Sequence, residues 1–201
     1  MIRRLLCLAV LLLGGLRPAP AAAQWVFVQP FAGLTFGGDT NIVDLEDATK
    51  LRKAAWGVTV TVIGRGTFGA EADFGFIPNF FQREEDSDIV TGSQVVTLMG
   101  NAVVAAPLSW IGESLRPYAS GGLGIMRTRV EDVFDIFSTD RNLLGVNVGG
   151  GAIGFLTERV GVRVDVRYFH SVSDLDERDP ISIGDAELSF WRAHAAIVLK
   201  Y

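Results

Sequence analysis

Two histidines lie beyond the first 23 residues, His170 and His194, and they are the candidate general bases of this sequence. His170 precedes Ser171, Ser173 and an aspartate, the residue types from which a serine nucleophile, its base and an orienting acid are built. On a β-strand, side chains an odd number of residues apart point to opposite faces. Val172 holds the position that a serine would need, and Ser173 would reach His170 only across a β-bulge. We therefore predict that the protein is not an enzyme.

Seven charged or titratable residues recur at a spacing of two, in three separate segments: Glu71 and Asp73; Arg163, Asp165 and Arg167; Arg192 and His194. A spacing of two places side chains on one face of a β-strand. Counted from the nearest turn or from the last residue, all seven lie at a similar depth. Charges out of water persist only when they are paired and hydrogen-bonded. We therefore predict one interior ion network, with His194 as a hydrogen-bonded member of it.

Eighteen of the 23 acidic residues gather in four stretches between the hydrophobic segments: Asp39, Asp44, Glu46 and Asp47; Glu84, Glu85, Asp86 and Asp88; Glu131, Asp132, Asp135 and Asp140; Asp174, Asp176, Glu177, Asp179, Asp185 and Glu187. The fourth stretch is dense enough to suggest Ca²⁺ or Mg²⁺, but its acids do not follow the spacing of a calcium-binding loop with its glycine and terminal glutamate. We expect solvated acidic loops at one end of the molecule, and neither a metal ion nor a cofactor.

The first 23 residues have the pattern of a secretory signal peptide. Met1–Arg4 is basic, Leu5–Leu16 is apolar, and Ala21–Ala23 form a small-residue cleavage site. We predict cleavage after residue 23 and a mature domain of residues 24–201. Cys7, the one cysteine, lies in the removed part, which excludes disulfides, cysteine-based zinc sites and a cysteine nucleophile. The net charge of −5 argues against nucleic acid as a partner.

Eight segments of the mature chain alternate between apolar and small or polar residues: 25–36, 53–63, 67–77, 93–106, 116–128, 142–155, 159–171 and 190–201. A period of two is typical of β-strands. Short links at 64–66 and 157–158 and an intermediate one at 107–115 alternate with long ones at 37–52, 78–92, 129–141 and 172–189. This order predicts an antiparallel up-and-down meander. No stretch has the ~20 apolar residues of a transmembrane helix.

The composition of the two strand faces predicts which one points outward. The polar face is small, as in Gly145, Asn147, Gly149 and Gly151, and small residues fit the narrow interior of an eight-stranded barrel. A soluble lipocalin-like barrel would instead need large apolar residues inside and a lysine- or glutamate-rich exterior. The sequence has only three lysines. The apolar face extends over about nine or more residues, as a membrane-spanning strand requires. We predict an all-β, eight-stranded antiparallel up-and-down transmembrane β-barrel.

Aromatic residues near the strand ends are typical of the girdles that flank a membrane-spanning band. We assign to them Trp56, Phe76, Phe80, Phe81, Tyr118, Tyr168, Phe169, Trp191 and Tyr201.

The export signal, the eight amphipathic segments and the final strand Ala193–Tyr201 resemble the small outer-membrane β-barrel proteins of Gram-negative bacteria, the OmpA-like, OmpX-like and OmpW-like group. The resemblance implies a monomer in the outer membrane, in contact with its lipid and lipopolysaccharide. It also implies that Ile197, Leu199 and Tyr201 form the signal that the barrel assembly machinery reads. It specifies no ligand.

The resemblance implies a structural or interaction role in the cell envelope, exercised by a barrel with a plugged lumen and four acidic extracellular loops. Three alternatives stay open. The barrel could be a small channel for ions or hydrophobic solutes. The acidic loops could be bridged by divalent cations to lipopolysaccharide phosphates. Residues 167–174 are also similar to the site of outer-membrane lipid A deacylases, where a histidine and a serine two residues later point outward, but Val172 departs from that pattern.

Overall fold

The structure, a computed structural model, describes residues 24–40, 52–80, 90–107, 115–132, 139–174 and 188–201. The expected signal peptide, residues 1–23, lies outside this part. Eight strands account for almost all of it: β1 Trp25–Thr40, β2 Lys53–Ile63, β3 Phe68–Pro78, β4 Val90–Ala105, β5 Leu115–Asp132, β6 Thr139–Phe155, β7 Val160–Asp174 and β8 Leu188–Lys200. The part of the chain described contains no helix that is long and apolar enough to span a membrane.

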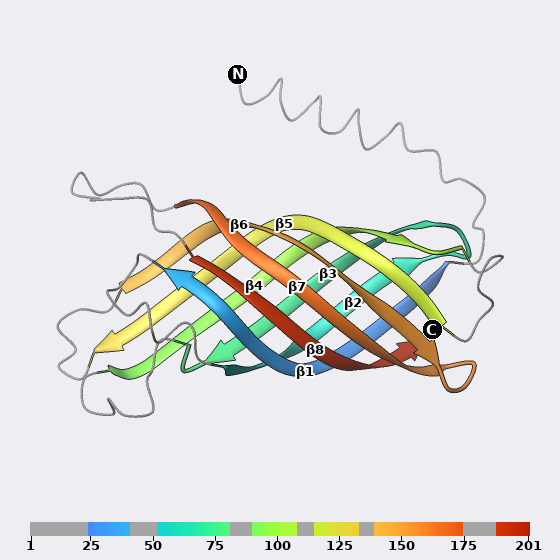
Figure 1. Ribbon diagram of the computed structural model, residues 1–201, viewed down its shortest axis with the longest axis horizontal. Coiled ribbons are helices and arrows are strands. Elements are labelled where there is room, and N and C mark those ends of the chain that lie inside the picture. The colour runs from blue at the N-terminus through green and yellow to red at the C-terminus, as the bar shows by residue number, and fades with distance from the viewer. Residues whose placement is uncertain (1–23, 41–51, 81–89, 108–114, 133–138, 175–187) are drawn as a thin grey trace, which may run out of the picture.

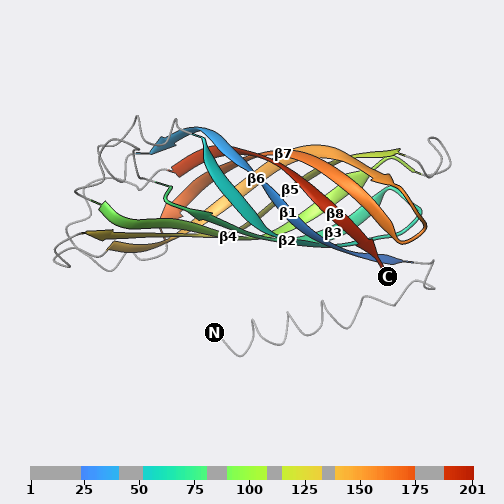
Figure 2. The ribbon, with the colours of Figure 1, turned by 90° about the horizontal axis from the view of Figure 1, so that it is seen from below.

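The strands form one closed barrel in which each strand pairs antiparallel with the next, and β8 pairs with β1. Figure 1 shows the strands tilted strongly across the long axis of the barrel, and Figure 2 shows the same wall after a quarter turn. The predicted eight-stranded up-and-down antiparallel barrel is therefore confirmed. We call the end that carries the links 64–67 and 156–159 the turn end, and the opposite end the loop end.

The seam between β1 and β8 closes the sheet at the turn end. The backbone N–H of Val26 donates to the carbonyl of Tyr201 (3.2 Å), and the N–H of Tyr201 donates to that of Val26 (2.9 Å). Lys200 donates its backbone N–H to the carbonyl of Arg159 (2.8 Å), which joins β8 to the β6–β7 turn beside it (Figure 1). A closed sheet leaves no unpaired edge strand.

The two faces of each strand differ as the alternation predicts. On β7, for example, Val162, Val164 and Val166 are exposed on the outer wall, whereas the intervening Arg163 and Arg167 are fully buried inside. Glycines on the inner face leave room for these long side chains. A Cβ atom at Gly149 would lie 2.6 Å from Cγ of Arg167, its partner on β7.

Several strands extend further toward the loop end than we predicted. Five acidic residues assigned to loops lie in strands: Asp39, Glu131, Asp132, Asp140 and Asp174. The predicted link 129–141 shrinks to 133–138. The alternation of apolar side chains ends where acidic and polar residues begin. The strand pairing continues beyond that point because its hydrogen bonds are made by backbone N–H and C=O groups.

Three aromatic residues assigned to the outer girdle lie in the interior instead. Phe80, Tyr118 and Phe169 are all buried, while Phe81 lies outside the described residues. Trp56, Trp191 and Tyr201 are exposed on the wall as expected. The error arose because a position near a strand end says nothing about which face the ring occupies.

The interior contains two apolar clusters, one toward each end. The cluster toward the loop end consists of Ala55, Ile77, Phe80, Val95, Met99, Met126, Leu143, Phe169, Leu188 and Phe190. The cluster toward the turn end consists of Phe27, Ile63, Val103, Ala105, Tyr118, Ile153 and Val198, with Trp25 and Phe155 packed against it. The polar residues of the interior therefore lie between two apolar layers.

Deleting Tyr201 removes both backbone hydrogen bonds to Val26 and one exposed aromatic ring. We expect a several-fold lower yield of folded barrel in the membrane fraction, measured as the species whose gel mobility changes on heating. Tyr201→Phe keeps both hydrogen bonds and the ring, and should match the wild type. Equal yields from the deletion and the wild type would show that the end of β8 is dispensable for closure.

Candidate functional site

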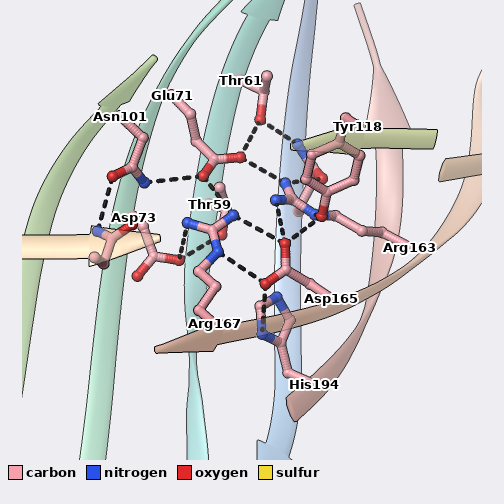
Figure 3. A network of polar contacts seen from close by, with 12 residues as sticks. Thr59, Thr61, Glu71, Asp73, Asn101, Tyr118, Arg163, Asp165, Arg167 and His194 are labelled. Atoms are coloured by element: carbon pink, nitrogen blue, oxygen red, sulfur yellow. Dashed lines mark hydrogen bonds and ion pairs between the residues drawn. The ribbon is translucent and has the colours of Figure 1, made fainter. Parts of the chain in front are cut away.

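The candidate site is a polar layer in the middle of the barrel, to which all eight strands contribute. The structure brings the seven predicted residues together there, from β3, β7 and β8. Figure 3 labels all of them except Arg192. Strands β3 and β7 face each other across the ring, so their long side chains meet in the interior. The residues are buried because the wall surrounds them and the two apolar clusters lie above and below them.

Glu71 is paired with arginines on both of its oxygens. Nη1 of Arg163 donates to Oε2 at 2.7 Å, and Nη2 of Arg167 lies 2.6 Å from Oε1. The hydroxyl of Thr61 donates to Oε2 at 3.0 Å, and the amide of Asn101 donates to Oε1 at 3.1 Å. Its carboxylate therefore has four partners, which is what a buried charge needs in place of its hydration shell.

Asp165 holds the two arginines of its own strand. Arg163 donates through Nη2 to Oδ2 (2.9 Å), and Arg167 donates through Nε to Oδ1 (2.8 Å). The hydroxyl of Tyr118, from β5, donates to Asp165 and accepts from Nε of Arg163. The guanidinium of Arg163 also stacks on the Tyr118 ring, 4.5 Å from its centroid. Asp165 therefore anchors both arginines in the directions that reach Glu71.

Asp73 and Arg192 form a second pair that joins β3 to β8. Nη2 of Arg192 donates to both oxygens of Asp73, at 2.8 and 2.7 Å. The guanidinium carbon lies 4.6 Å from the ring centroid of Phe31 and 4.7 Å from that of Phe169. Aromatic faces attract cations, so these rings stabilise the side of Arg192 that has no carboxylate. Gly75 makes the approach possible, because a Cβ atom there would be 2.4 Å from Nη1.

His194 differs from its prediction. It lies in the network, but its Nδ1 is 3.9 Å from Oδ1 of Asp165, and neither ring nitrogen has a hydrogen bond among the described residues. Its ring packs against Phe31, with 4.3 Å between centroids. The prediction of a hydrogen-bonded histidine was wrong because depth along β8 does not tell whether an acceptor faces the ring.

The formal charges of the network cancel. Its cations are Arg163, Arg167 and Arg192, and its anions are Glu71, Asp73 and Asp165; the side chains of these ion pairs are at most 1% exposed. Coulomb attraction is strong at low dielectric, and the cost of removing the ions from water is equally large. Such a layer is stable only as a complete set, because removing one partner leaves an unpaired buried charge.

Sequence reasoning missed the uncharged members of the layer: Gln29, Thr59, Thr61, Asn101, Tyr118 and Asn147. Gln29 donates to Thr61 (2.7 Å) and accepts from Arg163 (2.8 Å). Thr59 donates to Asp73 (3.1 Å), and Asn147 donates to Asn101 (2.8 Å). The signal was available, because each occupies the inward position of its strand at the depth of a charged residue. Uncharged polar residues are common enough that the pattern alone did not single them out.

Arg116 was also missed, and it belongs to the turn end rather than to the network. Its Nε donates to the carbonyl of Ala106 and its Nη1 to that of Gly64, both at 3.0 Å; its Nη2 donates to the carbonyl of Gly66. One buried guanidinium therefore ties the β2–β3 turn to the link after β4. It satisfies carbonyls that the sheet leaves unpaired.

The space between the network and the turn-end cluster is almost completely filled. A cavity lined by Glu71, Arg163, Arg116 and neighbouring apolar residues has a volume of about 10 Å³. One water molecule needs roughly 10–15 Å³ measured in this way. This cavity is too small to conduct a hydrated ion.

Around His170 the structure contains the β-bulge that the sequence analysis named as the condition for Ser173 to reach this histidine. Ser171 is buried on the inner face, where its Oγ accepts the backbone N–H of Leu188 (2.8 Å), while Val172 is exposed. The pairing of β7 with β6 shifts by one residue at this point, so Ser173 rather than Val172 lies opposite Leu144. His170 stacks on Tyr168, with 6.3 Å between ring centroids. Among the described residues no three His, Cys, Asp or Glu side chains are grouped as a metal site.

The three residues of the expected assembly signal lie on the outer face of β8 and at its end. Ile197 is 55% exposed and Tyr201 76% exposed, with Leu199 half-buried between them. Their arrangement is that of a continuous apolar row on the wall at the turn end.

Comparison with known proteins identifies relatives of this architecture. A family model described as the outer membrane protein beta-barrel domain matches residues 8–189. No curated protein matches the sequence. Among solved structures, Neisserial surface protein A is 10% identical with a TM-score of 0.59, covering 86% of this chain and 96% of its own.

Two barrels from Pseudomonas aeruginosa are also similar. The N-terminal β-barrel domain of OprF is 13% identical with a TM-score of 0.54, covering 88% of this chain and 97% of its own. The outer membrane protein OprG is 14% identical with a TM-score of 0.54, covering 90% and 96%. At these identities the likeness concerns the fold alone.

Replacing Glu71 or Arg163 by alanine should each lower the free energy of unfolding by about 3–5 kcal/mol, because each leaves a buried charge without its partner. The free energy of unfolding of the double variant should fall by at least about 1.5 kcal/mol less than the sum of the two single effects. The reason is that the second replacement removes the buried charge that the first left unpaired. Urea-dependent unfolding in lipid vesicles measures all three. As a control, Glu71→Ala combined with Arg52→Ala on the outer face should be additive. Additivity between Glu71 and Arg163 would contradict their coupling.

Proposed function

The chain belongs to the outer membrane protein β-barrel domain family, and on that premise we propose that it is a closed outer-membrane barrel with a structural or interaction role in the cell envelope. Its family places it in the outer membrane. In the proposal, the signal peptide of residues 1–23 exports it, and the loop end faces the outside of the cell. The final residues Ile197, Leu199 and Tyr201 are read by the barrel assembly machinery.

The observation that carries the proposal is the filled interior. Three arginines and three carboxylates are paired across the lumen, and an apolar cluster covers the layer on each side. An ion crossing the barrel would have to displace paired charges and two apolar layers. In this proposal the lumen acts as a hydrophobic and ionic core, and the protein functions through its outer surfaces.

The acidic loops are the surface that we assign to the interaction. Their sequences carry a dense negative charge at 44–47, 84–88 and 174–187, although most of these residues lie outside the described part of the chain. Acidic segments repel one another and stay solvated, which suits loops that project from a membrane. Divalent cations that bridge them to lipopolysaccharide phosphates are a means of anchoring such loops.

We also propose that the protein has no acyl hydrolase activity. A serine nucleophile must lie within hydrogen-bond reach of its base, and Ser171 is committed to the inner face by its contact with Leu188. Val172 is exposed two residues after His170. The β-bulge at this point places Ser173 in register with Leu144, so Ser173 is the serine whose activity the proposal denies.

Recorded in a planar lipid bilayer, the folded protein should show no stable open level, because the paired charges and apolar layers leave no continuous water path. An open porin in the same bilayer provides the positive control. Heat-dependent gel mobility confirms that the recorded protein is folded. A reproducible single-level conductance would overturn the closed lumen and favour the channel.

Incubated with lipid A, the purified barrel should release no fatty acid, and His170→Ala should be indistinguishable from the wild type. Mass spectrometry of the lipid measures the release. Fatty acid release that is lost in His170→Ala would show that the barrel is an enzyme.

A further inference from the structure

A mostly apolar groove crosses the outer wall over β6, β7, β8 and β1, and Asp165 and His194 of the polar layer also border it. Its volume is about 630 Å³, within the roughly 300–1,000 Å³ of typical small-molecule pockets. The residues that line it include Ala32, Leu34, Val166, Ala193, Ala195 and Arg52. We call it the β1–β8 groove.

The register of the strands explains why the wall is hollow here. Two neighbouring rows of outward residues consist of small or medium side chains: Gly150, Val166, Ala193 and Leu34; Ala152, Val164, Ala195 and Ala32. The next row toward the loop end is bulky, with Tyr168, Trp191 and Phe36 in register. The row toward the turn end contains Ile197 beside Val162. Small and medium side chains therefore form the floor, and Phe36 of the bulky row lines the edge toward the loop end.

The groove faces lipid, and its shape suits a flexible chain. Most of the residues that line it are apolar or glycine. Trp191 and Ile197, in the rows on either side of it, are 41% and 55% exposed. The convex wall of a second barrel would not fill a concave groove between two rows of larger side chains. An extended hydrocarbon chain would, because it can follow the two rows and contact both walls.

A positively charged side chain, that of Arg52, lies at the same groove. Arg52 is exposed and contributes to its lining. It precedes Lys53, which pairs with Thr35 in β1, so Arg52 lies toward the loop end of the groove. A ligand that matches both features has an apolar chain and an anionic head. A guanidinium binds phosphate particularly well, through two parallel hydrogen bonds.

We propose that the β1–β8 groove binds one acyl chain of a lipid of the lipid A class, with a phosphate of its headgroup on Arg52. The choice of an outer-leaflet lipid rests on the orientation in the proposed function, with the loop end outside. The aromatic row of Tyr168, Trp191 and Phe36 then lies between the groove and the loops, at the depth where an interfacial girdle belongs. The groove lies just below it, where the acyl chains of the outer leaflet begin.

Titration of the detergent-purified protein with lipid A, followed by native mass spectrometry, tests the site. Wild type should retain one lipid A. Ala195→Leu fills the floor and should weaken retention at least tenfold, whereas Ala72→Leu, an equally exposed alanine on β3, should not change it. Arg52→Gln should weaken retention by about tenfold, the equivalent of one charge-assisted contact. Arg65→Gln, in the β2–β3 turn at the other end of the barrel, is the matched control and should leave retention unchanged.

Small cysteine variants provide a second measurement that does not depend on filling the groove. A photoreactive label on Ala195→Cys should crosslink lipid A in mixed vesicles several-fold more than the same label on Ala72→Cys, which meets lipid A only as bulk lipid. Equal crosslinking at both positions, or retention unchanged by Ala195→Leu, would overturn the site. Phosphatidylglycerol held as tightly as lipid A would overturn the choice of lipid, and a dimer disrupted by Ala195→Leu would show a self-association face instead. None of these outcomes depends on whether the lumen conducts.

Discussion

The pairing of three arginines with three carboxylates in the barrel interior is the constraint on which the rest of the structure depends. An arginine such as Arg167 is tolerated at 0% exposure only because Glu71 and Asp165 face it. The register of the barrel must therefore place the charged residues of β3, β7 and β8 at one depth. The wall must also provide Gly75 and Gly149 as gaps into which the arginines fit. The two apolar clusters exclude water from the layer, which strengthens every ion pair within it.

The polar layer of the interior links all eight strands of the barrel. Every strand contributes a side chain to the polar layer, so the layer links strands that the ladder alone joins only to their neighbours. Arg116 does the same at the turn end, through three backbone carbonyls. If the lumen serves as a core, as we propose, the surfaces left for function are the loops and the lipid-facing wall. The β1–β8 groove belongs to the second, and the acidic segments belong to the first.

Much of the fold and the charged part of the site could be predicted, because both follow from a period of two. A period of two does not tell where a strand ends or which partner a side chain meets, and the predictions failed at those points. The strand ends at Asp39 and Asp174 are held by backbone pairing. Phe80, Tyr118 and Phe169 turn inward although their positions near strand ends suggested a girdle. His194 reaches the layer but packs on Phe31 instead of finding an acceptor.

By itself, the sequence determined the strands, their order and the inward face, since each depends on residues close together in the chain. It also determined that Glu71, Asp73 and the arginines would share one compartment. Only the tertiary structure decided which acid meets which arginine, that Tyr118 and Asn101 complete the layer, and that apolar clusters enclose it. It alone produced the β1–β8 groove, because a hollow made by Ala32, Ala195 and Gly150 depends on the register between strands far apart in sequence. Those contacts are set by barrel closure, which no local pattern encodes.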